Sequence, residues 1–157
     1  MADRPDPLNI VIASDHAGFD MKTVLADWLR TQGHAVDDLG PFDTASVDYP
    51  DYGYKLAESI AEGRAAFGVA VCGSGIGIAI AINREPRARC ALVSDTLSAR
   101  LARSHNDANV IAFGARLIGI DTAKDALATV LATPFIGDRH TARVAKLGHP
   151  HFAKEPA

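Results

Sequence analysis

Residues 73–77 read Gly-Ser-Gly-Ile-Gly, a spacing of glycines that could bring backbone N–H groups to an anion. The segment is not the G-x-G-x-x-G fingerprint of a dinucleotide site, because residue 78 is isoleucine. It is not a phosphate-binding P-loop either, because no Gly-Lys-Ser/Thr follows. The competing interpretation is a tight turn that only permits close packing, and the residues alone favour neither.

Cys72 directly precedes this segment, at the end of an apolar run over residues 67–72 that is typical of a buried strand. If a helix begins after the glycines, its N-terminus favours a thiolate, which acts as a base or a nucleophile. The alternative is a small buried hydrophobic residue, as most isolated cysteines are. For Cys90, which lies within the apolar stretch 89–93, we accept that packing role.

Two histidines stand where they could act on a ligand. Asp15 and His16 follow the apolar run 8–13, and an aspartate at that place can bind hydroxyls or orient a ring. The alternative is a helix cap next to an exposed histidine. His105 comes at the end of a predicted helix, and histidine suits proton transfer near neutral pH. Its alternative is an imidazolium that the helix C-terminus favours.

Arg139 and Arg143 are four residues apart, so both project from one face of a predicted helix. Two guanidinium groups on one face suit a phosphate, and His140 stands beside them. The alternative is a solvated basic face. His149 and His151 flank a proline at the start of a tail, residues 149–157, that we expect to be loose, and we infer no metal site from them.

Short apolar runs alternate along the chain with amphipathic stretches. Strands are expected at residues 8–13, 35–39, 67–72, 89–93 and 109–113. Helices are expected over residues 21–29 (ended by Gly33), from 52 to about 62 (capped by Asp51), through 97–101 (capped by Ser94 or Asp95), over 123–131 (capped by Asp121) and over 139–147. This alternation predicts a parallel sheet with helices on both faces and with ligands at the carboxyl ends of the strands.

The stretch 69–82 fits two structures. Isoleucine at residues 76, 78, 80 and 82 alternates with glycine or alanine, and this period of two favours a β-hairpin. Small residues at alternate positions also suit a helix packed on a sheet. Because strands and helices alternate elsewhere in the chain, we prefer the helix.

The composition is that of a globular protein, with 157 residues of which 48% are hydrophobic and 22% charged. This length suits a single domain, residues 1–157. A net charge of −3 gives no support for binding to nucleic acids or membrane surfaces. Two cysteines without a Cys-x-x-Cys spacing argue against a disulfide scaffold and a zinc module. We find no signal region and no stretch of about 18 apolar residues, and expect a cytoplasmic protein.

Together these motifs resemble type B ribose-5-phosphate isomerase, in the wider family that includes galactose-6-phosphate isomerase subunits. The matching segments are 15–18 (Asp-His-Ala-Gly), 48–50 (Asp-Tyr-Pro), 71–77 (Val-Cys-Gly-Ser-Gly-Ile-Gly), 104–110 (Ser-His-Asn-Asp-Ala-Asn-Val), 113–116 (Phe-Gly-Ala-Arg) and 139–143 (Arg-His-x-x-Arg). The resemblance extends from about residue 8 to residue 147. It implies a Rossmann-like three-layer α/β sandwich with a five-stranded parallel sheet. It also implies a helix after Gly75, and a homodimer or tetramer with active sites at the subunit interface.

The resemblance also implies roles for single residues. Cys72 matches the catalytic base of one branch of the family, whereas another branch uses a glutamate just after the glycine loop, where residues 76–78 carry no carboxylate. His105 matches the residue that assists opening of the furanose ring. Ser74 stands where many members have threonine, and it keeps the hydroxyl. The implied substrate contacts are Asp15, His16, Tyr49, Gly73, Ser74, Gly75, Ile76, Gly77, Asn106, Arg116, Arg139 and Arg143.

These roles predict an aldose–ketose isomerase that interconverts ribose 5-phosphate and ribulose 5-phosphate through an enediolate. Cys72 would move a proton between carbons 2 and 1, and Asp15 would orient the sugar hydroxyls. Ser74 and the backbone N–H groups of residues 73–77 would stabilise the anion, with the phosphate among the basic residues. No metal or redox cofactor is expected. The alternatives are the same chemistry on allose 6-phosphate, galactose 6-phosphate or a tetrulose 4-phosphate, and a sugar-phosphate-binding protein without catalysis.

Overall fold

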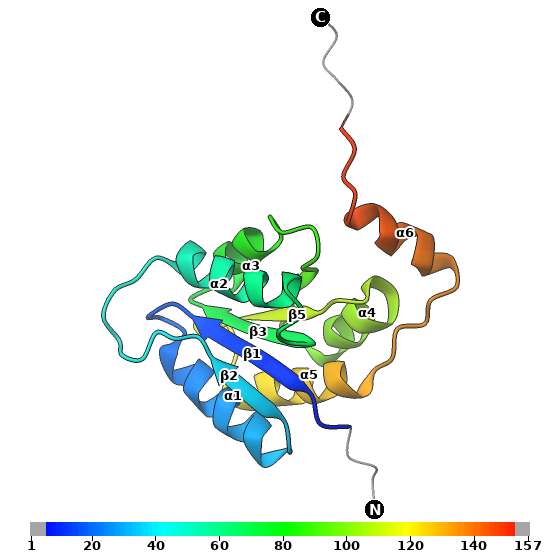
Figure 1. Ribbon diagram of the computed structural model, residues 1–157. Coiled ribbons are helices and arrows are strands. Elements are labelled where there is room, and N and C mark those ends of the chain that lie inside the picture. Colours follow the sequence, from blue (N-terminus) through cyan, green and yellow to red (C-terminus); the bar gives the residue numbers. More distant parts are fainter. Residues whose placement is uncertain (1–5, 153–157) are drawn as a thin grey trace, which may run out of the picture.

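The structure is a computed structural model that describes residues 6–152 (Figure 1). Five parallel strands form one sheet in the order β2-β1-β3-β5-β4. The strands are β1 (Asn9–Ser14), β2 (Ala35–Asp38), β3 (Phe67–Cys72), β4 (Cys90–Leu92) and β5 (Val110–Gly114). All five lie within or next to the predicted runs. The predicted α/β sandwich with a five-stranded parallel sheet is confirmed.

Six helices accompany the sheet in the described part of the chain. They are α1 (Phe19–Thr31), α2 (Tyr49–Ala61), α3 (Ile76–Ile82), α4 (Thr96–Asn106), α5 (Ile120–Ala132) and α6 (Arg139–Leu147). Helices α1, α4 and α5 pack on one face of the sheet and α2 and α3 on the other, while α6 lies outside the layers beside α4 (Figure 1). None of the described helices is long and apolar enough to cross a membrane.

The central strand β3 is buried along its whole length. Side chains of successive strand residues point to opposite faces, so Val69 and Val71 join the core under α1 and α5. Ala70 and Cys72 join the core under α2 and α3. The Cys72 side chain is therefore directed to the face that α3 covers, just where β3 ends.

Two expectations about helices need correction, and one ambiguity is resolved. Helix α2 begins at Tyr49 rather than at residue 52, because Asp48 is the extended N-cap residue and Pro50 fits the first turn. Helix α5 follows Gly119, so Asp121 lies in its first turn and is not its cap. The isoleucine-rich stretch forms helix α3, which confirms the helix over the hairpin.

The strand order determines where loops leave room for a ligand. From β1 the chain crosses through α1 to β2 on one side, whereas β3 and the later strands lie on the other side. At such a reversal the two connecting segments diverge and leave a crevice at the carboxyl edge of the sheet. The segments that follow β1 and β3 begin with Asp15 and Gly73.

Candidate functional site

A cavity of about 300 Å³ opens at this crevice. The residues that line it are Asp15, Tyr49, Cys72, Gly73, Ser74, Gly77, Arg116 and Leu117. All but Leu117 were singled out from the sequence. They come from the segments after β1, β3 and β5 and from the first residue of α2, so the sheet brings together four distant parts of the chain.

Backbone hydrogen bonds between these segments define the walls of the cavity. The Asp15 N–H donates to the Val71 carbonyl (3.2 Å), and the Ala115 N–H donates to the Cys72 carbonyl (2.9 Å). The Arg116 N–H donates to the Gly73 carbonyl (3.0 Å). Backbone hydrogen bonds thus fix the loops after β1, β3 and β5 to one another. The functional groups on these loops are therefore already in position when no ligand is bound.

Cys72 is a free cysteine whose side chain is 3% exposed. Its Sγ accepts a hydrogen bond from the Gly75 N–H at 3.1 Å. Gly75 makes this contact from the left-handed region (φ 75°), and a Cβ there would lie 2.8 Å from the backbone carbon of Phe113. The hydrogen bond from the Gly75 N–H to the Cys72 sulfur therefore depends on a glycine at position 75.

Asp15 and Ser74 carry the other polar groups on the cavity wall. Asp15 is 7% exposed, and its Oδ1 accepts a hydrogen bond from the Gly18 N–H at 3.0 Å. The Ser74 Oγ accepts from the Ile76 N–H at 3.2 Å, which leaves the hydroxyl proton free to be donated to a ligand. An acceptor and a donor therefore line the same cavity as the Cys72 thiol.

Arg116 and Tyr49 extend the cavity toward solvent. A Cβ on Gly73 would lie 3.2 Å from a terminal nitrogen of Arg116, so the guanidinium lies close over this glycine. A Cβ on Gly77 would lie 2.6 Å from the Tyr49 ring, which packs directly on that residue. These two glycines make room for larger side chains at the rim.

His16 lies just outside the cavity lining. Its Nδ1 is 3.1 Å from the amide nitrogen of Val47 and 3.2 Å from the Val47 carbonyl oxygen. A single ring nitrogen makes one of these bonds at a time, depending on the tautomer. In either case the ring is tied to the loop that leads into α2, so His16 helps to fix the segment that carries Tyr49.

The other predicted residues form a second group at the end of α4 and on α6. His105 and Asn106 are the last two residues of α4, whereas Arg139 and Arg143 lie on α6 with exposed side chains. The His105 ring stacks on the His140 ring, with centroids 4.3 Å apart and planes 12° from parallel. The segment before α6 is joined to α4 where the Ile136 N–H donates to the Ser104 carbonyl (3.0 Å).

These two groups lie at opposite edges of the sheet. Because β4 and β5 are parallel, α4 runs back from the carboxyl edge to the amino edge, and His105 lies at the far end of that path. With 11 residues at 1.5 Å each, α4 spans about 16 Å. None of the second group lines the Cys72 cavity; Asn106 lines a separate cavity of about 390 Å³. The described chain alone does not bring Cys72 and His105 together.

Three side chains near these groups are buried or paired in ways that the sequence did not predict. Lys22 on α1 is 1% exposed and donates to Asp38 (2.8 Å) and to the Pro41 carbonyl (2.8 Å), which anchors the loop after β2. Asp107 ends α4 in the left-handed region and pairs with Arg103 (2.9 Å). A lysine or aspartate near a helix end resembles a solvated residue in sequence, so only the tertiary contacts distinguish them. The third is His140, whose burial against α4 is equally invisible in the helical pattern.

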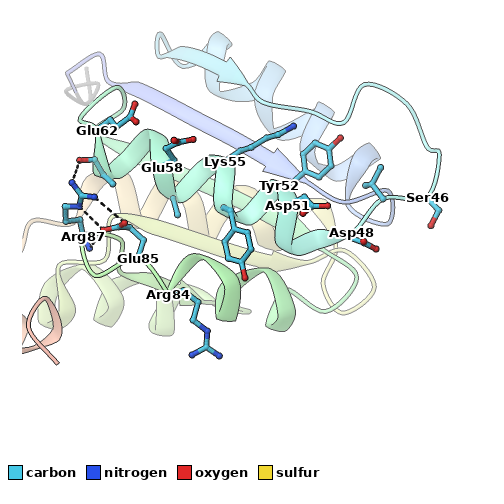
Figure 2. A pocket seen from close by; sticks show the side chains of 14 residues that line it. Ser46, Asp48, Asp51, Tyr52, Lys55, Glu58, Glu62, Arg84, Glu85 and Arg87 are labelled. Carbon is cyan, nitrogen blue, oxygen red and sulfur yellow. Dashed lines mark hydrogen bonds and ion pairs between the residues drawn. The ribbon is translucent and has the colours of Figure 1, made fainter. Parts of the chain in front are cut away.

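A larger cavity, of about 1140 Å³, lies elsewhere (Figure 2). It is an open groove along α2 and the segment after α3, and none of the predicted site residues lines it. Figure 2 shows Arg87 bonded to Glu85 at one end of the groove. This hydrogen-bonded partner lowers the pKa of Glu85. The groove lacks both the buried thiol and the glycine turn, so it is not the candidate active site.

Cys90, the other cysteine, does not line the Cys72 cavity. Burial raises the pKa of the Cys90 thiol to about 12, which agrees with the packing role expected for it. Among residues 6–152, no group of three or more histidine, cysteine or carboxylate side chains is placed to hold a metal ion.

Comparison with known proteins identifies the family. The family model described as Ribose/Galactose Isomerase matches residues 10–147. The chain is 38% identical over 135 residues to ribose-5-phosphate isomerase B of Escherichia coli, covering 86% of this chain and 91% of that protein. It is 38% identical over 143 residues to D-erythrulose-4-phosphate isomerase of Pectobacterium atrosepticum, covering 90% and 94%.

Solved structures agree with this assignment. The fold matches that of ribose-5-phosphate isomerase B from Clostridium thermocellum with a TM-score of 0.88, at 44% identity over 89% of this chain and 95% of that one. The match to the family model, over residues 10–147, includes both groups of polar residues. The chain is thus an isomerase and belongs to the ribose/galactose isomerase family.

Proposed function

We propose that the protein interconverts ribose 5-phosphate and ribulose 5-phosphate, with Cys72 as the base that moves a proton between carbons 2 and 1. The observation that carries this proposal is the buried Cys72 thiol at the cavity wall, whose Sγ accepts a hydrogen bond from the Gly75 N–H. A sulfur that a backbone N–H holds at the wall of a cavity is placed to take a proton from the carbon of a bound sugar.

The reaction needs no outside oxidant or reductant. In the open-chain aldose, the Cys72 thiolate takes the proton from carbon 2, and the electron pair moves into the sugar to give an enediolate. The thiol then returns its proton to carbon 1, while the hydroxyl proton on oxygen 2 moves to oxygen 1. The Ser74 hydroxyl donates to the enediolate, and Asp15 accepts from a substrate hydroxyl. In the earlier step that opens the furanose ring, His105 donates a proton to the ring oxygen.

We also propose that two copies of the chain form each site. Cys72 and His105 lie at opposite edges of one sheet, so a second chain is needed to place a His105 near a Cys72. Exposed apolar side chains lie on α3, β4 and α4, the elements at one end of the sheet. They are Ile76, Ile80, Leu92, Leu97 and Leu101. Burying such a surface against a second copy is the usual origin of stable dimers, and it supports a phosphate site in which Arg139 and Arg143 belong to the partner.

Replacement of Cys72 tests the proposed function. Purified Cys72→Ala protein should lose turnover of ribose 5-phosphate to ribulose 5-phosphate by about 10²-fold or more, the usual range for loss of a positioned base. Cys90→Ala is the matched control, because it removes the other thiol of the chain, which is partly buried and does not line the cavity. Near-wild-type turnover of the Cys72→Ala protein would overturn the assignment.

A second substrate is favoured by one observation. The relative from Pectobacterium atrosepticum is named D-erythrulose-4-phosphate isomerase, so a four-carbon ketose phosphate is a specific alternative for the same chemistry. Ranking ribose 5-phosphate, ribulose 5-phosphate, erythrulose 4-phosphate and the 6-phosphates of allose and galactose by kcat/KM decides between them. A protein that binds all of them without turnover would instead be a sugar-phosphate-binding protein.

A further inference from the structure

The His140 side chain is unusual because it is buried and yet one of its ring nitrogens has no hydrogen-bond partner in the described residues. His140 is the second residue of α6 and is 7% exposed, although the helix around it is largely exposed. Its Nε2 is buried, and within the described residues it has no hydrogen-bond partner. A buried polar atom without a partner destabilises the fold, so an apolar ring would suit simple packing better.

A second buried histidine provides the contrast. His34 also has a buried Nε2 without a partner in the described chain. Its Nδ1, however, accepts a hydrogen bond from the Leu8 N–H (3.2 Å), which ties the segment before β1 to the end of α1. This bond explains the histidine at position 34 by structure alone. The contact that distinguishes His140 is its stack on His105.

The His105 ring depends on that stack for its orientation. No hydrogen bond to its imidazole is found within residues 6–152, and the ring is only partly buried. A catalytic histidine usually has a carboxylate or a carbonyl that fixes its plane. Here the near-parallel His140 ring is the contact that restricts rotation of His105.

We propose that His140 is a positioning residue, whose buried ring is the platform that sets the orientation of the His105 imidazole for proton exchange with the sugar ring oxygen. The part of this inference that concerns catalysis rests on the proposed function of His105. The platform itself does not, because it follows from the burial of His140 and the geometry of the two rings.

The charges around His140 keep this platform neutral. Burial lowers the pKa of His140, and the positive charges of His105 on α4 and of Arg139 and Arg143 on α6 lower it further, whereas Asp138 opposes them weakly. The lowered pKa favours an uncharged His140 ring at neutral pH. Protonation of His140 under more acidic conditions adds a positive charge beside Arg139 and Arg143, so the stack weakens.

Two substitutions at position 140 separate the platform from the titrating group. His140→Ala removes the ring and should lower kcat with ribose 5-phosphate about ten- to a hundredfold, because a misplaced proton-transfer group loses that much. His140→Phe keeps a flat ring at the same place and should restore most of kcat. On the acid side, kcat of the wild type should fall more steeply than kcat of His140→Phe, because phenylalanine cannot be protonated.

The direction of the reaction gives a further control. Ribulose 5-phosphate has its carbon 5 oxygen phosphorylated and cannot close a five-membered ring, so its conversion needs no ring opening. The kcat of His140→Ala should therefore fall less with ribulose 5-phosphate than with ribose 5-phosphate. His34→Ala, which also removes a buried histidine ring, should impair both directions equally, in proportion to any loss of folded protein.

Nuclear magnetic resonance of the histidine rings tests the platform without any assay of activity. The His105 ring protons, assigned with a His105→Asn variant, should shift in His140→Ala through loss of the neighbouring ring current, and remain shifted toward the wild-type position in His140→Phe. Unmoved His105 resonances in His140→Ala, or unchanged kcat in that variant, would overturn the inference. If ribose 5-phosphate proved not to be a substrate, moved resonances would still support the platform while the proposed function failed.

Discussion

The two groups of polar side chains are held in place by different means. At the carboxyl edge, Cys72 and Asp15 are buried, and the loops around them are hydrogen-bonded to one another through the backbone. At the amino edge, Arg139 and Arg143 project into solvent, and a ring stack fixes His105. The first group is preorganised within one chain, whereas the second presents its functional groups outward, as expected of residues that complete a neighbouring site.

Mixing two inactive variants tests most directly whether the two groups of side chains form one site between two chains. Cys72→Ala and His105→Asn should each be inactive alone. If each site takes its cysteine from one chain and its histidine from the other, a mixed dimer has one intact site and regains turnover. Subunits exchanged by mild denaturation and refolding, then assayed with ribose 5-phosphate, provide the measurement. No activity after proven exchange would place both residues in a site within one chain.

Substitution of Gly75 tests how far the carboxyl-edge group is preorganised. An alanine there would combine a positive φ of 75° with a Cβ 2.8 Å from the Phe113 backbone, so the turn must move and the N–H must leave the Cys72 Sγ. Because this N–H holds the sulfur of the proposed base, we expect kcat to fall about 10²-fold or more, the range for loss of a positioned base. Gly63→Ala is the matched control, since Gly63 has a similar φ of 72° but open space around it. The kcat of the control should be unchanged.

The ion pairs near the two edges should differ in their contribution to stability. Lys22→Met removes the partner of Asp38 and of the Pro41 carbonyl in a buried setting, and should lower the free energy of unfolding by about 3 kcal/mol or more. Arg103→Met removes the partly exposed pair with Asp107 and a hydrogen bond to the Ala108 carbonyl. Asp107 keeps Arg89 as a partner, so the loss should be only about 1–2 kcal/mol. Urea denaturation measures both. Equal losses would contradict a difference in rigidity between the two regions.

Acidification should have the smallest effect on the free energy of unfolding, and part of that effect should come from His140 at the amino edge. Because the pKa of folded His140 is below its ordinary value of 6.5, the unfolded chain binds more protons in that range, and stability falls as the pH drops below 6.5. The free energy of unfolding of His140→Phe should fall less over the same range than that of the wild type. His149→Phe, at an exposed position near the C-terminus, should follow the wild type. A wild-type-like decline in His140→Phe would contradict the expected direction.

Much of the site near the carboxyl edge was accessible from sequence. The apolar runs before Asp15 and before Gly73 predicted strand ends, and parallel strands place such ends at one edge of the sheet. Asp95 also follows a strand, β4, but it caps α4 by accepting from the Ser98 N–H (2.6 Å), as one of the two predicted caps, and does not line the cavity. A strand end positions a residue at the right edge without directing its side chain.

The alternation of apolar runs and amphipathic stretches by itself determined the parallel α/β class, because strand and helix periods are local properties of the chain. The order of the motifs likewise indicated the family. Only the tertiary structure decided that Lys22 and His140 are buried, since burial depends on contacts between distant segments. It also decided that Cys72 and His105 lie at opposite edges of the sheet. The reason is geometric, because a helix that connects parallel strands carries its last residues back to the edge where the next strand begins.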